Sequence, residues 1–232
     1  IRKIGEISQC FALAIPAASH WPNPRPLATR ENAMGLSKIS LENFRNHAAT
    51  TLGETAHFNL LVGENGAGKT NLLEAISLLG PGRGLRRANL ADLARKPAPG
   101  ADPLPFAIGA SLIEQGTVSA RLGTYTEAGA PGRRLVRVNS AAATAASLAE
   151  WLALSWLTPA MDRLFSESSG SRRRFLDRLV LALHPGHGQR VNRYEAAMRE
   201  RTRLLTADGP ADPVWLAGLE ADMAEHGAAI AA

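Results

Sequence analysis

Cysteine and long apolar runs are almost absent from this chain, and each absence argues against a class of protein. Cys10 is the only cysteine among the 232 residues, so no disulfide can form within the chain. A chain of this kind suits a reducing compartment, and we expect a cytoplasmic location. No apolar run approaches the roughly 20 residues of a membrane-spanning helix. We therefore expect neither a disulfide framework nor contact with a membrane.

Acidic residues are also fewer than basic ones. The chain has 26 lysines and arginines against 21 aspartates and glutamates, which gives a formal net charge of +5 and a pI of about 10.0. This balance favours a polyanionic partner, although an arginine-rich proteome would produce the same charge. Hydrophobic residues make up 45% of the chain, enough for the core of one large domain or two small ones.

One stretch carries a specific chemistry. Residues 63–70 fit the pattern G-x-x-x-x-G-K-[ST] of a phosphate-binding loop. Glycines let such a loop curl until successive backbone N–H groups converge on an anion, and the helix that follows adds the positive end of its dipole. The pattern predicts that Lys69 reaches the β- and γ-phosphates and that the Thr70 hydroxyl binds Mg²⁺. The predicted nucleotide-binding residues are Gly63, Glu64, Asn65, Gly66, Ala67, Gly68, Lys69 and Thr70.

The flanking residues fit such a loop. The apolar run from Phe58 to Val62 predicts a buried strand that enters the loop, and the run from Leu72 to Leu79 predicts a buried helix that leaves it. Gly80-Pro81-Gly82 ends that helix. The motif is therefore expected between a strand and a helix.

Residues 1–33 differ from the rest. The chain opens with Ile1 instead of methionine, and Pro16, Pro22, Pro24 and Pro26 interrupt any periodicity. We expect a non-native or disordered extension here, with Met34 as the true start.

The remainder divides into two expected parts, an ATP-binding lobe at 34–140 and a linker with the start of a second, helical lobe at 141–232. In the first part, Leu36 to Phe44 predicts a strand, and alternating apolar residues from Phe106 to Val138 predict an antiparallel meander. In the second part the pattern predicts a short strand followed by three helices, with these landmarks: Leu154–Leu157 for the strand, Ser171 as the first helix cap, Val191–Leu205 for the second helix, and Asp212 as the third cap.

Several stretches together resemble the RecF family of bacterial DNA replication and repair ATPases, which is related to SMC and ABC-type heads. The resemblance covers the chain from Met34 onward. It rests on Leu41-Glu42-Asn43-Phe44-Arg45-Asn46, the loop with Asn71-Leu72-Leu73-Glu74-Ala75-Ile76 after it, Gly82-Arg83-Gly84-Leu85-Arg86, Leu157-Thr158-Pro159 and Arg172-Arg173-Arg174-Phe175-Leu176-Asp177.

The resemblance implies an α/β fold, a P-loop NTPase of ABC/SMC-head type with a mixed sheet and an antiparallel β subdomain, followed by an incomplete helical lobe. It implies ATP and Mg²⁺ as cofactors and an ATP-dependent homodimer on gapped DNA or at junctions of single and double strands. It further implies RecR and RecO as partners, with loading of RecA in recombinational repair and the SOS response as the outcome.

Two motifs of ABC-type heads are missing. We find neither a serine-glycine signature nor a Walker B carboxylate at the end of an apolar strand. Leu112-Ile113-Glu114 is the stretch most similar to a Walker B motif. The Gln115-Gly116 that follows it favours the end of a β-hairpin strand instead. We therefore expect a chain truncated at its C-terminus that binds nucleotide weakly and hydrolyses it poorly, with no catalytic residue of its own.

Arginines supply the candidate contacts outside the loop. Arg45 either approaches the nucleotide phosphates, as the resemblance suggests, or ends a strand at the surface. Two basic stretches either contact DNA phosphates or form solvated surface. The DNA-binding candidates are Arg83, Arg86, Arg87, Arg172, Arg173 and Arg174.

Other functions of a phosphate-binding loop stay open. A small-molecule kinase or GTPase would use the same loop, but the sequence has no Asn-Lys-x-Asp and no Asp-x-x-Gly, which argues against GTP. An SMC-like structural head or a nucleotide-free scaffold would use the fold without turnover.

Overall fold

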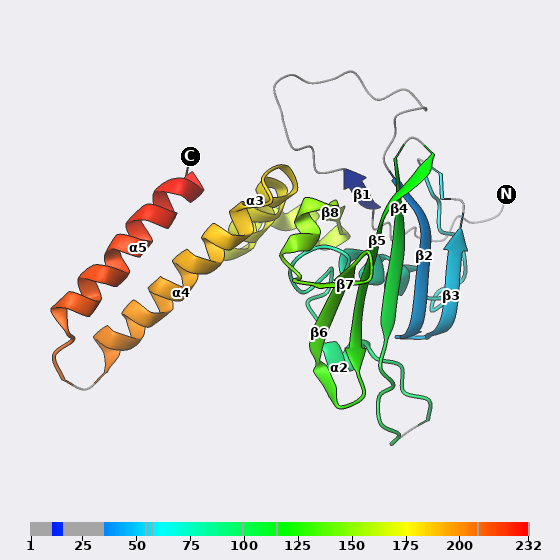
Figure 1. Ribbon diagram of the computed structural model, residues 1–232, viewed down its shortest axis with the longest axis horizontal. Coiled ribbons are helices and arrows are strands. Elements are labelled where there is room, and N and C mark those ends of the chain that lie inside the picture. The colour runs from blue at the N-terminus through cyan, green and yellow to red at the C-terminus, as the bar shows by residue number, and fades with distance from the viewer. Residues whose placement is uncertain are drawn as a thin grey trace.

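Two antiparallel sheets and a series of helices make up the part of the protein that the structure describes (Figure 1). The computed structural model describes residues 11–15, 35–53, 55–56, 58–98, 100–114, 116–207 and 209–231. Figure 1 shows the larger sheet on one side of the molecule, and the helices α4 and α5 as a hairpin that extends away from it.

The larger sheet has six strands in the order β3-β2-β4-β5-β6-β7. Its strands are β2 (Gly35–Phe44), β3 (His47–Gly53), β4 (Ala107–Glu114), β5 (Thr117–Glu127), β6 (Ala130–Val138) and β7 (Ala141–Ala143). Each neighbouring pair is antiparallel. The predicted first strand and meander are confirmed, and they join into one continuous sheet. Parallel pairs, which a mixed sheet requires, are absent from the described residues.

The helix α1 (Lys69–Ser77) packs against this sheet and completes the core. Alternate residues of the central strands are buried in this core, as β4 shows with Ile108, Ala110 and Leu112. The rings of Phe44 and Phe106 meet edge to face, with centroids 5.4 Å apart. The helix contributes Leu72, Ala75, Ile76, and, just beyond its end, Leu78 and Leu79 to the same cluster.

The smaller sheet pairs β1 (Phe11–Ile15) with β8 (Ala153–Leu157) in antiparallel register. The strand expected at Leu154–Leu157 is confirmed. Of residues 1–33, only Phe11–Ile15 lies within the described part, so the rest of the expected extension lies outside it. Those five residues form a strand because β8 supplies a hydrogen-bonding edge. The expected domain boundaries stay a prediction.

The buried strand expected at Phe58–Val62 does not form. Phe58, Leu60 and Val62 are 85%, 79% and 82% exposed, and the segment has no regular structure. An extended segment becomes a strand only when a neighbouring strand bonds its backbone groups. Neither sheet in the described part of the chain includes these residues. The apolar pattern therefore indicated a segment suited to burial, and could not indicate whether a strand lies beside it.

In the described part of the chain, two short 3₁₀ helices and four further helices accompany α1 and the sheets. They are α2 (Leu90–Leu93), η2 (Ser147–Glu150), η3 (Pro159–Ser166), α3 (Ser169–Leu183), α4 (His187–Thr206) and α5 (Pro213–Ala231). The three predicted long helices are thus present. Among the helices of the described ranges, none combines the length and the apolar character needed to cross a membrane.

The caps of these helices were predicted with mixed success. Asp212 Oδ1 accepts from the backbone N–H of Val214 at 2.9 Å, so it caps α5 as expected. The cap of α3 is Ser168, three residues before the expected Ser171, and its hydroxyl accepts from the N–H of Ser171. The prediction of Ser171 is wrong because both serines satisfy the same preference and only backbone geometry selects between them.

Candidate nucleotide-binding site

The phosphate-binding loop has the backbone conformation that its glycines permit. Gly66 and Gly68 have φ angles of 85° and 97°, in the region that side chains disfavour. Gly68 is the N-cap of α1, and no side chain caps the helix there. The N–H groups of the first helical turn therefore stay available to an anion at the positive end of the helix dipole.

Lys69 lies across the loop rather than away from it. Its Nζ donates to the carbonyl oxygens of Gly63 at 2.8 Å and Glu64 at 2.9 Å. The loop is also closed by a hydrogen bond of 3.2 Å from the N–H of Ala67 to the same Glu64 oxygen. The ammonium group is thus held over the residues whose amides would surround a phosphate, as the sequence pattern predicts.

Side chains at the turn between β2 and β3 contact the backbone of the phosphate-binding loop. Asn46 Nδ2 donates to the Gly66 oxygen at 3.3 Å, and His47 Nε2 lies 3.2 Å from the Gly68 oxygen. His47 is itself fixed by a 2.9 Å contact between its Nδ1 and Thr50 Oγ1. From the sequence, neither Asn46 nor His47 was given a role at the site. Their polar side chains directly after a strand are the signal that could have found them.

A substitution at Gly68 tests how much the contacts of Asn46 and His47 with the loop contribute to stability. A Cβ at this position would lie 2.6 Å from His47 Nε2 and 2.9 Å from both side-chain termini of Asn46. We expect Gly68→Ala to lower the free energy of unfolding by about 2 kcal/mol, since a left-handed conformation alone costs an L-residue roughly 1–2 kcal/mol. Thermal unfolding measures this. Gly66→Ala is the matched control, because its φ of 85° is also left-handed while its Cβ would meet no atom within 4 Å; equal losses for both variants would contradict the support.

A buried carboxylate lies behind the loop, on α1. Glu74 is 2% exposed and accepts from Arg45 through two hydrogen bonds of 3.0 Å, Nε to Oε2 and Nη2 to Oε1. Arg86 Nη1 donates to Glu74 Oε2 at 3.2 Å. Arg45 also donates to the Asp92 backbone oxygen at 3.0 Å. This Glu74 cluster therefore engages two of the arginines that the sequence proposed for the nucleotide and for DNA. A contact between Arg45 and phosphates stays a prediction.

The cluster is connected to the loop by side-chain amides. Arg86 Nη1 donates to Asn71 Oδ1 at 2.9 Å, and Asn71 Nδ2 donates to Asn46 Oδ1 at 2.8 Å. Asn46 in turn bonds the Gly66 backbone. A continuous chain of hydrogen bonds thus joins the phosphate-binding loop to the basic segment around Arg86.

The remaining candidate arginines differ in their partners. Arg83 donates to Asn89 Oδ1 at 3.1 Å, and Arg172 donates to the Glu167 backbone oxygen at 2.6 Å. Arg173 lies 3.7 Å from Asp177 Oδ2 and over the ring of Tyr194. Arg174 bonds only a neighbouring hydroxyl, Ser171 Oγ, at 2.9 Å. No hydrogen bond or ion pair joins the Arg87 guanidinium to any residue that the structure describes.

Arg134 is a further arginine that sequence reasoning missed. From β6 it donates to the backbone oxygens of Leu78, Gly80 and Gly82, and to Thr124 Oγ1. These carbonyls lie at and just beyond the C-terminus of α1, where a cation is favourable. Burial lowers the pKa of the Arg134 guanidinium to about 10. No local sequence pattern predicts this pairing across more than 50 residues.

A magnesium site made by protein side chains alone is absent from the described residues, which contain no group of three or more His, Cys, Asp and Glu residues able to hold a metal. Mg²⁺ needs oxygen ligands and commonly takes several of them from the phosphates and from water. Thr70, the second residue of α1, fits such a shared site because it supplies one hydroxyl beside the loop.

A glycine-rich loop that opens a helix, beside an antiparallel sheet, defines this chain as a P-loop NTPase head of the ABC and SMC type. The family described as RecF/RecN/SMC N terminal domain matches residues 35–158, more than half of the chain, and the chain belongs to this family. The family recognised from the sequence motifs is therefore confirmed.

Two similar proteins carry the same name. The chain is 54% identical over 199 residues to the DNA replication and repair protein RecF of Mesorhizobium japonicum, covering 85% of this chain and 51% of that protein. It is 48% identical over 203 residues to the protein of that name from Brucella suis, covering 88% of this chain and 52% of that protein. The chain thus spans about half the length of the relatives it matches.

A solved structure shares the fold. The structure of the recombination mediator protein RecF with ATP in the RecFOR pathway superposes with a TM-score of 0.72 at 22% identity, covering 86% of this chain and 52% of that one. The predicted fold class is thereby confirmed.

Proposed function

We propose that the chain is the nucleotide-binding part of a RecF-type ATP-dependent DNA repair protein. The single observation that carries the proposal is the loop itself, with two left-handed glycines, an uncapped helix start and Lys69 folded back over the loop. Family membership and relatives named for DNA replication and repair support it.

The residues of the loop would perform distinct tasks on ATP. The amides from Gly63 to Thr70 surround the phosphates, and Lys69 exchanges its two carbonyl partners for phosphate oxygens of higher negative charge. Thr70 holds Mg²⁺ together with those oxygens. A bound metal would supply charge neutralisation at the phosphates. We assign no catalytic residue to the chain, and expect at most weak ATPase activity from it.

DNA would be the second ligand, bound through backbone phosphates by the basic segments that hold Arg83, Arg86, Arg87 and Arg172 to Arg174. Gapped DNA and junctions of single and double strands, a homodimer that forms with ATP, and RecO and RecR as partners belong to the same proposal. The RecF neighbour's assignment to the RecFOR pathway supports it. The outcome would be the loading of RecA during the SOS response, and the protein would act in the cytoplasm.

Replacing Lys69 tests the nucleotide site. We expect Lys69→Met to weaken ATP binding roughly 10- to 100-fold, because charge-assisted hydrogen bonds each contribute roughly 1.5–3 kcal/mol. Titration of a fluorescent ATP analogue with Mg²⁺ measures the affinity, and DNA-dependent dimerisation on gapped duplexes is followed in parallel.

The control for this experiment is Lys96→Met, which removes the same charge from an exposed position in a loop. If Lys69→Met still bound ATP and still dimerised on gapped DNA, the proposed function would lose its basis. Failure of the unaltered chain to bind ATP with Mg²⁺ would favour a nucleotide-free scaffold instead.

A further inference from the structure

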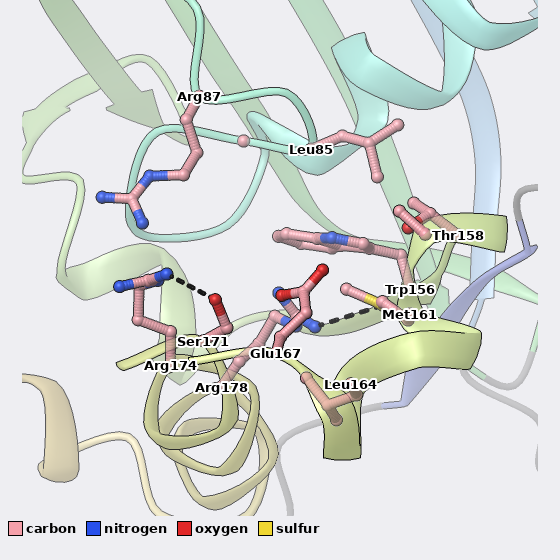
Figure 2. A pocket seen from close by; sticks show the side chains of 12 residues that line it. Leu85, Arg87, Trp156, Thr158, Met161, Leu164, Glu167, Ser171, Arg174 and Arg178 are labelled. Carbon is pink, nitrogen blue, oxygen red and sulfur yellow. Dashed lines mark hydrogen bonds between the residues drawn. The ribbon is translucent and has the colours of Figure 1, made fainter. Parts of the chain in front are cut away.

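A cavity of about 230 Å³ lies between the basic loop after α1 and the start of α3 (Figure 2). The loop contributes Gly84, Leu85 and Arg87 to the lining, and the other lining residues come from β8, from η3 and its flanking residues, and from α3. The cavity is smaller than the roughly 300–1,000 Å³ of sites for drug-sized ligands. Its size therefore suits one small group rather than a whole nucleoside triphosphate, and it lies apart from the phosphate-binding loop in the sequence.

Two arginines that the rest of the molecule does not neutralise line this cavity. Figure 2 shows Arg87 from the loop and Arg174 from α3 with their guanidinium groups on the same side of the pocket. Within the described ranges, Arg87 has no ion-pair or hydrogen-bond partner, and Arg174 bonds only Ser171 Oγ. Two cations brought to one place with no carboxylate paired to either repel each other, and an anion between them relieves that repulsion.

A third arginine lies deeper. Arg178 is over the ring of Trp156 at 4.4 Å and over Phe175 at 5.5 Å, and its Nε is buried without a hydrogen-bond partner among the described residues. No described carboxylate forms an ion pair with it. A partly buried charge with aromatic neighbours and an unused donor is favoured when an anion approaches. The aromatic surface of Trp156 belongs to the same cavity.

We propose that this cavity binds a single phosphate group of a DNA strand, with Arg87 and Arg174 holding its oxygens near Trp156 and Arg178. The proposal rests on the proposed DNA-binding function and selects, from the six arginines that the sequence offered, the two that converge. Arg86 and Arg173 are excluded because Glu74 and Asp177 already pair with them.

The carboxylate of Glu167, which also lines the cavity, should repel a bound anion, and its removal gives an additional test. Glu167 lines the pocket, is exposed, and forms no ion pair with any described residue. Figure 2 shows its carboxylate pointing into the cavity. Removing its charge with Glu167→Gln is expected to tighten phosphate binding two- to threefold, because three guanidinium groups then face the ligand without a competing carboxylate.

The first arm of the experiment measures binding of a labelled single-stranded oligonucleotide by fluorescence anisotropy at several salt concentrations. Arg87→Gln with Arg174→Gln is expected to weaken binding tenfold or more at low salt, and to make the slope of log K against log salt less steep by about 0.7, the value for one phosphate contact on single strands. The control is Arg121→Gln with Arg193→Gln, which removes the same charge from exposed positions on β5 and α4 that have no side-chain partner among the described residues. Equal effects of the two double variants would overturn the proposal.

The second arm uses inorganic phosphate and separates this site from DNA binding in general. In a Lys69→Met background, which removes a principal phosphate contact of the loop, phosphate is expected to change the fluorescence assigned to Trp156 by comparison with Trp156→Phe. The change should vanish with Arg87→Gln. A phosphate response at Trp156 in a protein that does not bind the oligonucleotide would sustain the anion site and contradict the proposed DNA function. No response to phosphate, together with unaltered oligonucleotide binding in the arginine variants, would overturn the site.

Discussion

Replacing Glu74 with alanine is expected to lower the free energy of unfolding by about 3 kcal/mol, which for a chain of this size lowers the unfolding midpoint by roughly 6–12 °C. The change removes the partner of two arginines at once, since Arg45 and Arg86 both donate to this carboxylate. Breaking a buried ion pair on one side costs roughly 3–5 kcal/mol. We expect the lower end because the side chains of Arg45 and Arg86 are 24% and 44% exposed and can regain water.

The control variants separate charge from helix propensity. Alanine favours the helix at least as much as glutamate, so a loss in Glu74→Ala cannot come from α1 itself. Glu74→Gln keeps the shape and some hydrogen bonds and should fall between alanine and the unaltered chain. Glu42→Ala, at an exposed position of β2, should change stability little. Chemical denaturation followed by circular dichroism measures all three variants. If Glu74→Ala lowered the free energy of unfolding by less than about 1 kcal/mol, hydration of Arg45 and Arg86 would replace nearly all that their ion pairs with Glu74 contribute.

The Glu74 cluster also shows which contacts could not be predicted from the sequence. The phosphate-binding loop could be predicted because its determinants are neighbours in the chain, so spacing alone defines the backbone geometry. Glu74 lies 29 residues from Arg45 and 12 from Arg86. Sequence reasoning proposed those two arginines for phosphates because nothing local shows that a buried carboxylate will face them. Only the packing of α1 on the sheet brings the three together.

The same distinction separates the strands. The meander from β4 to β6 could be predicted because each strand pairs with the next one along the chain. The pairing of β1 with β8 joins residues far apart in the chain, and the hydrophobic periodicity of neither segment predicts it. Residues 58–62 have a pattern suited to burial, yet they lie outside both sheets of the described part. Periodicity thus predicts what a segment can do, and tertiary pairing decides whether it does so.

Arg134 joins the sheet to the nucleotide-binding helix by a comparable long-range contact, and its loss should be nearly as costly. Its guanidinium donates to three backbone carbonyls, those of Leu78, Gly80 and Gly82, at the end of α1 and in the turn that leads to the basic loop. Each buried carbonyl left without a donor costs roughly 1–3 kcal/mol. Burial opposes the charged form of Arg134, as the lowered pKa of about 10 shows, so removing the charge also relieves a desolvation penalty.

We therefore expect Arg134→Met, which keeps a long apolar stem, to lower the free energy of unfolding by about 2–3 kcal/mol, because the two part-buried carbonyls left without a donor, those of Leu78 and Gly80, outweigh the relieved desolvation. Arg133→Met is the matched control, because the neighbouring side chain is exposed and forms no hydrogen bond or ion pair with a described residue. Arg134→Lys keeps the charge but not the planar set of donors, so it should recover only part of the loss. Denaturant unfolding compares the three variants. If Arg134→Met were as stable as Arg133→Met, the carbonyls would be satisfied by water, and the sheet would not fix the end of α1 through this side chain.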